Sequence, residues 1–128
     1  MKKKYNVEEM YVVNAHASGY EEGSCRSGRL FVEKVNEVHY VEVLSNLEVY
    51  QEEPNITKFN KKWYFTEIKP LKDYLYENMD LIKKEAIRQE WFMKDNKKLI
   101  KKLSKKHIVL THEDFRALQC IIISLFEN

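Results

Sequence analysis

The chain has 128 residues, of which 44% are hydrophobic and 12% aromatic, and it carries a formal net charge of +2. This length suits one domain with a buried core, and this composition excludes an intrinsically disordered chain. The small net charge does not by itself indicate a nucleic-acid-binding protein. No apolar run reaches the roughly 18 residues that a membrane-spanning helix needs. We therefore expect a single domain over residues 1–128, without a membrane partner.

The stretch MKKKYNVEEM at the start of the sequence contains three lysines, but no apolar segment follows them. A secretory signal needs such a segment, so we expect a cytoplasmic protein. Cys25 and Cys120 lie far apart in the sequence. Because cytosolic proteins rarely form disulfides, we expect both cysteines to be free thiols.

The first half of the chain alternates apolar and polar residues in short runs that are rich in β-branched and aromatic side chains. This pattern predicts strands separated by turns. The predicted strands cover residues 9–17, 28–35, 38–44, 47–51 and 61–68. Pro54 marks the stretch 52–60 as a connecting loop. Four to five successive strands predict an antiparallel sheet.

The spacing of apolar residues changes after Pro70. Proline suits the first position of a helix, and an apolar stripe at helical spacing follows it, made of Leu71, Leu75, Met79, Ile82 and Ala86. The pattern extends to Leu99 and Leu103, with a break expected at Asp95-Asn96. A last helix is expected from Thr111, because Thr111 and Asp114 have the spacing of a capping box.

These patterns predict an α+β fold. An N-terminal antiparallel sheet, in about residues 9–68, precedes two or three helices in about residues 70–128. We expect the helices to pack on one face of the sheet.

The segment GYEEGSCRSGRLF, residues 19–31, holds every glycine of the chain and two of its four arginines. Glycine allows the backbone conformations of an anion-binding turn, and arginine binds phosphate or carboxylate with two parallel hydrogen bonds. The segment lacks the spacing of a P-loop, so a plain hairpin loop is the alternative. We name as a candidate anion site Gly23, Gly28, Arg26 and Arg29, with Arg116 of the last helix as a further member.

A lysine run forms a second candidate site. Residues 69–128 carry thirteen Lys and Arg against nine Asp and Glu, and the run KDNKKLIKKLSKK covers residues 94–106. On a helix, one side of this run holds Lys94, Lys98, Lys101 and Lys105. Such a stripe attracts a polyanion or an acidic partner, and the alternative is a solvated helix face. The absence of arginine from the run argues against base-specific contacts.

Catalytic and metal-binding patterns are weak. Cys25 lies near two arginines and needs a base such as His16 or His39, which we expect on adjacent strands. The histidines and cysteines match no zinc motif, so we expect neither a metal nor a cofactor. Aromatic residues of the strands, such as Trp63 and Phe65, would stack bases on an open sheet, but packing in the core is the default.

The profile of a small, lysine-rich α+β chain resembles that of small phage or mobile-element proteins that inhibit host defence enzymes or capture their signals. This resemblance assigns no role to any residue. We expect a non-enzymatic binding protein that occupies a nucleic-acid-handling host protein or sequesters a nucleotide-type anion, with nucleic acid as a further possible partner. A small phosphoester hydrolase or nuclease and a structural assembly subunit are the alternatives. The sheet edge and the aromatic strand 61–68 lead us to expect a homodimer or a larger homo-oligomer.

Overall fold

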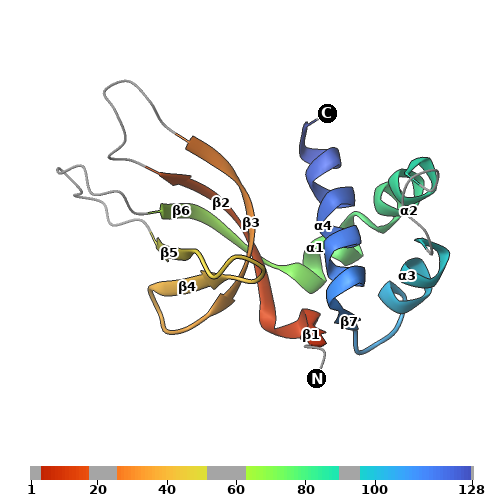
Figure 1. The fold of residues 1–128 in the computed structure, drawn as a ribbon, viewed down its shortest axis with the longest axis horizontal. Coiled ribbons are helices and arrows are strands. Elements are labelled where there is room, and N and C mark those ends of the chain that lie inside the picture. Colours follow the sequence, from red (N-terminus) through yellow and green to blue (C-terminus); the bar gives the residue numbers. More distant parts are fainter. Residues whose placement is uncertain (1–3, 18–25, 52–62, 90–95, 128) are drawn as a thin grey trace. The chain divides into compact units, whose positions relative to one another are not determined.

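A computed structural model describes residues 4–17, 26–51, 63–89 and 96–127 (Figure 1). The α+β class is confirmed, because strands gather in the first half of the chain and helices in the second. The chain divides into two compact units. The barrel unit is Glu9–Pro70, and the helical unit combines Met1–Glu8 with Leu71–Asn128. Each unit is described by itself below.

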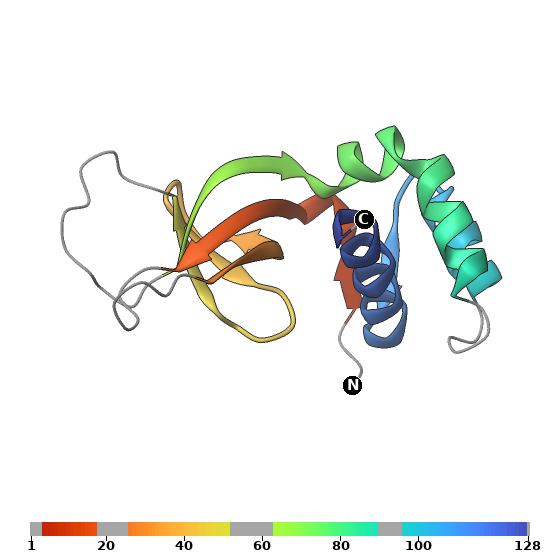
Figure 2. The ribbon, with the colours of Figure 1, turned by 90° about the horizontal axis from the view of Figure 1, so that it is seen from above.

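The barrel unit is a closed sheet of five strands, in the order β2-β3-β4-β5-β6. Their bounds are β2 (Met10–Ala17), β3 (Arg26–Lys34), β4 (His39–Glu42), β5 (Glu48–Gln51) and β6 (Trp63–Pro70). Figure 2 shows these strands curving around one another.

Closure corrects the prediction of a purely antiparallel sheet. Four neighbouring pairs are antiparallel, but β5 and β6 run parallel. An odd number of strands cannot alternate in direction all the way around a ring, so one parallel pair is unavoidable. A parallel pair needs a long connection, which the chain provides between β5 and β6. Within the described ranges, each barrel strand has hydrogen-bonded neighbours on both sides, so the free sheet edge expected to support self-association is not there.

The interior of the barrel takes every second residue of each strand, as strand geometry requires. Its core is made of Val13, Ala15, Val32, Tyr40, Val49 and Phe65, with Trp63 packed against it. Core packing of the aromatic strand is therefore confirmed for Trp63 and Phe65. The register of β2 and β6 shifts between Asn14 and Ala15, which leaves Thr66 without a counterpart on β2. Such a bulge bends a strand and helps a sheet to close.

The described residues of the helical unit form a small sheet and four α-helices, where two or three helices were predicted. The helices are α1 (Leu71–Glu77), α2 (Met79–Arg88), α3 (Asn96–Leu103) and α4 (His112–Glu127). Strands β1 (Lys4–Asn6) and β7 (Val109–Thr111) pair antiparallel, and neither was predicted. A short 3-10 helix, η1 (Val7–Glu9), follows β1. None of the described helices is long and apolar enough to cross a membrane.

The apolar stripe of the sequence forms the inner face of α1 and α2. Leu71, Leu75, Ile82 and Ala86 are buried. The stripe was predicted to lie on one helix, but the chain breaks at Asn78, whose side-chain amide donates a 2.9 Å hydrogen bond to the carbonyl of Tyr74. Asparagine competes for backbone groups in this way and interrupts helices.

The predicted capping box at the start of α4 is confirmed. The Asp114 amide donates to Thr111 Oγ1 at 3.2 Å, and the Thr111 amide donates to Asp114 Oδ2 at 3.3 Å. A buried carboxylate then ties α4 to α2. Glu85 accepts hydrogen bonds from Arg88, Gln89 and Ser124.

Candidate functional site

The lysine run forms an exposed face of α3, as its spacing predicts. Leu99 and Leu103 are buried in the helical unit, whereas Lys97, Lys98 and Lys101 are exposed. At about 100° per residue, these three lysines lie within an arc of about 100° on the helix. Lys94 lies outside the described residues.

Lys105 extends this face past the end of α3. The helix ends at Leu103, but the Ser104 and Lys105 amides donate to the carbonyls of Lys101 and Lys102 at 3.3 and 3.2 Å. These i to i+3 bonds tighten the chain into one further turn, and Lys105 is exposed there. We call the set Lys97, Lys98, Lys101 and Lys105 the lysine surface.

The lysine surface differs from Lys102 and Lys72 in having no carboxylate partner within the described parts of the chain. Lys102 pairs with Asp114, and Lys72 Nζ lies 3.0 Å from Glu8 Oε1. Over its whole sequence, the helical unit carries fifteen Lys and Arg against ten Asp and Glu, a net charge of +5. Four exposed ammonium groups on a unit of that charge create a positive potential, which attracts anions.

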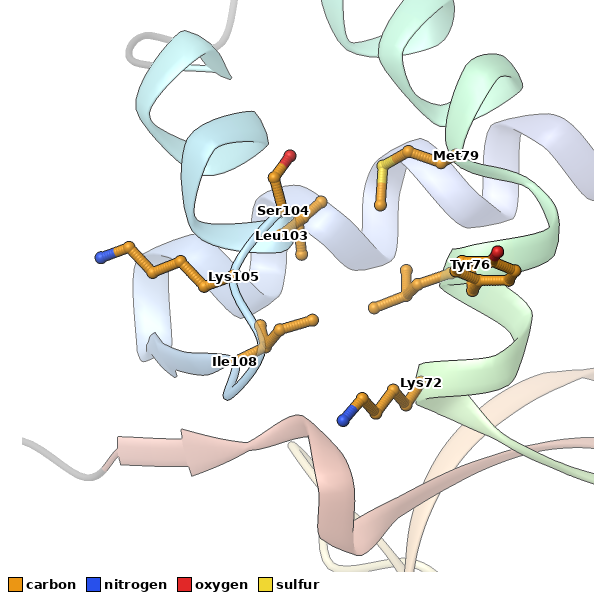
Figure 3. A pocket seen from close by; sticks show the side chains of 8 residues that line it. Lys72, Tyr76, Met79, Leu103, Ser104, Lys105 and Ile108 are labelled. Carbon is orange, nitrogen blue, oxygen red and sulfur yellow. The ribbon is translucent and has the colours of Figure 1, made fainter.

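A pocket of about 300 Å³ adjoins the lysine surface within the helical unit. Figure 3 shows side chains from α1, from the start of α2 and from the end of α3 meeting around it. The floor is apolar, formed by Leu75, Met79, Leu103 and Ile108. The rim is exposed and carries Lys72, Tyr76, Ser104 and Lys105.

Hydrogen bonds hold one side of this rim in place. Glu8 Oε1 lies 3.0 Å from Lys72 Nζ and 2.9 Å from His107 Nδ1, and Lys72 Nζ also donates to the carbonyl of Lys106 at 3.1 Å. The Lys72 ammonium, and after it His107, hold the pKa of the Glu8 carboxyl below its usual range. The network ties η1, α1 and the segment before β7 together next to the pocket.

The predicted arginine and glycine site is only partly described. Gly23 and the side chain of Arg26 lie outside the described residues. Gly28 lies within β3, opposite Ala15. Arg29 Nη1 lies 3.7 Å from Glu67 Oε2, so a carboxylate already compensates its charge. Arg116 is exposed on α4 in the other unit, and its convergence with Arg26 and Arg29 stays a prediction.

The candidate catalytic histidines lie on the barrel exterior. A row of rings crosses four strands, with centroid distances of 6.4 Å for His16–Tyr64, 6.4 Å for Tyr50–Tyr64 and 4.8 Å for His39–Tyr50. The strands of His16 and His39 were expected to be adjacent, but β3 lies between β2 and β4. Cys25 lies outside the described residues. No cluster of metal-ligating side chains occurs in the ranges that the structure describes.

Sequence patterns found the lysines of the site but not the pocket. No pattern in the sequence marks Tyr76, which is exposed although Tyr74 and Leu75 before it are buried. The pocket depends on Ile108 being brought next to α1, which no local pattern encodes. Comparison of the chain with protein-family models, with curated proteins and with solved structures finds no match.

Proposed function

We propose that this is a non-enzymatic binding protein that holds an anionic partner against the lysine surface of its helical unit. The observation that carries the proposal is the contrast between Lys102, which pairs with Asp114, and the exposed Lys98 and Lys101 beside it on α3. Lys102 makes an ion pair within the fold, whereas Lys98 and Lys101 are exposed to solvent. Their mutual repulsion brings the fold no benefit.

The finer parts of the proposal concern the partner. An acidic surface of a nucleic-acid-handling host protein fits the lysine surface, and phage or mobile-element origin fits the small lysine-rich chain. Capture of a nucleotide-type ligand by Arg26, Arg29 and Arg116 is less favoured, because Arg29 already faces Glu67. The hydrolase alternative is also less favoured, since His16 and His39 are not on neighbouring strands.

Charge reversal tests the proposal. The double variant Lys98→Glu/Lys101→Glu should elute from a heparin column at a markedly lower salt concentration than the unmodified protein, because the number of ionic contacts sets the salt dependence of polyanion binding. The matched control is Lys4→Glu/Lys84→Glu, which makes the same change of charge at two exposed lysines that are not part of the lysine surface. Equal elution of the two double variants would mean that overall charge, and not this surface, holds the polyanion.

A further inference from the structure

The pocket and the lysine surface are continuous, because Lys105 belongs to both. In Figure 3 the stem of Lys105 lies at the rim while its ammonium group points away from the hollow. We propose that the pocket takes one apolar side chain of an acidic polypeptide segment, and that the carboxylates of this segment lie against the lysine surface. This inference rests on the proposed function and names the class of its partner.

The floor of the pocket favours an apolar occupant. Leu75, Leu103 and Ile108 are almost fully buried, and Figure 3 shows Ile108 reaching toward α1 while Met79 reaches in from the start of α2. A volume of about 300 Å³ lies at the lower end of ligand sites, which suits one side chain better than a whole cofactor. Methionine also adapts its shape to different apolar groups.

Tyr76 supports a protein partner. Its side chain is 85% exposed, although its neighbours Tyr74 and Leu75 are buried. Tyrosine is enriched in protein–protein interfaces, where residues that line a pocket contribute most of the binding energy. An exposed tyrosine ring on the rim of an apolar pocket therefore provides the surface that would close over an inserted side chain.

The same lining argues against nucleic acid as the preferred partner. Binding of single strands uses several aromatic rings on which bases stack, whereas the lining of this pocket holds one ring, that of Tyr76. The hydroxyl of Ser104 on the rim donates to the carbonyl of Ile100 at 3.1 Å, so its proton is not available to a base or a phosphate. The lysine surface attracts carboxylates and phosphates alike, so it is the apolar lining beside Lys105 that favours an acidic polypeptide.

Fluorescence anisotropy with three labelled probes tests the inference. The first probe is a short peptide of glutamates and glycines with one central phenylalanine, the second has serine in place of the phenylalanine, and the third is a single-stranded DNA of the same net charge. We expect the phenylalanine peptide to bind about tenfold more tightly than the serine peptide, since burial of an aromatic side chain contributes a gain of that order. We also expect it to bind more tightly than the DNA.

Two variants localise the effect. Tyr76→Ala removes an exposed ring and leaves the core intact, and Met79→Glu places a carboxylate at the first residue of α2, where helices tolerate a negative charge. Both should abolish the preference for phenylalanine over serine. The control Leu81→Ala truncates a half-exposed residue of α2 that does not line the pocket, and it should keep the preference.

The outcomes separate this inference from the proposed function. Equal binding of the two peptides, or tighter binding of the DNA, would overturn the pocket inference, and the lysine surface would stand as a general site for anions. Binding of none of the three probes would overturn both. A preference for phenylalanine that survives Tyr76→Ala and Met79→Glu would place the apolar contact elsewhere and also overturn the inference.

Discussion

The barrel unit and the helical unit use their charged residues differently. The barrel unit has seven Lys and Arg against ten Asp and Glu, and two of its cations, Arg29 and Lys34, each lie beside a carboxylate. The helical unit has the opposite excess. Within its described residues it buries one carboxylate, Glu85, as the barrel unit buries Glu42, but it also leaves four lysines exposed on one face.

This difference separates charges that serve the fold from charges that do not. Glu85 has a complete set of partners from α2 and α4, and it is only 7% exposed. Its removal would take away the acceptor that these side chains share. Lys98 lies beside other lysines of α3, so its removal should relieve repulsion. The two kinds of charge thus predict effects of opposite sign on stability.

The largest effect is expected for Glu85→Ala. The variant leaves Gln89 and Ser124 without their acceptor and Arg88 without its counterion, which should lower the free energy of unfolding by about 2–3 kcal/mol. Urea denaturation followed by circular dichroism measures this change. The control Glu113→Ala removes an exposed carboxylate of α4 and should cost less than about 1 kcal/mol. Equal losses of unfolding free energy in the two variants would mean that the hydrogen bonds of Glu85 do not stabilise the fold more than an exposed carboxylate does.

A smaller change in the free energy of unfolding is expected when the pH is lowered. Hydrogen bonds from Arg88, and then from Gln89, lower the pKa of Glu85 from 4.5 to about 2. Because the folded protein has the lower pKa, the ionised carboxylate stabilises it fully above pH 4.5, and this stabilisation is lost as the pH falls toward 2. The difference in unfolding free energy between the unmodified protein and Glu85→Gln should therefore be constant from pH 7 to about pH 5 and shrink below that. A difference that stays constant down to pH 3 would contradict the assignment.

The smallest effect is expected for Lys98→Glu, with the opposite sign. The new carboxylate would lie four residues before Lys102, the favourable order for an ion pair on a helix, and it would remove a like-charge contact. We expect a gain of about 0.2–0.5 kcal/mol in unfolding free energy. Urea denaturation at low salt, compared with the unmodified protein, measures this gain. A loss of stability would show that Lys98 serves the fold and would remove the basis for treating the lysine surface as a binding site.

The local parts of the structure were predictable from the sequence. Alternation predicted strands at 9–17 and 28–35, which the structure places at Met10–Ala17 and Arg26–Lys34. The pair Thr111 and Asp114 predicted the start of α4. The helical spacing of Lys98 and Lys101 placed them on one exposed face. Each of these signals depends on residues within one or two turns of one another.

The parts that were missed depend on contacts between distant residues. Strands β1 and β7 have three residues each, too few for a period, and they pair across most of the chain. Closure of the barrel depends on the register of β2 with β6, including the bulge at Thr66. The pocket depends on Ile108 meeting α1. Sequence patterns therefore found the charge of the candidate site and missed its shape.

The pairing of β1 with β7 also bears on how the chain folds as the ribosome makes it. The barrel unit is continuous in the chain, so all of its strands are available once Pro70 has emerged. In the helical unit, Lys4–Asn6 cannot pair until Val109–Thr111 have been synthesised, more than a hundred residues later. Since domains fold as units during synthesis, the barrel would be complete while β1 still lacks its partner strand.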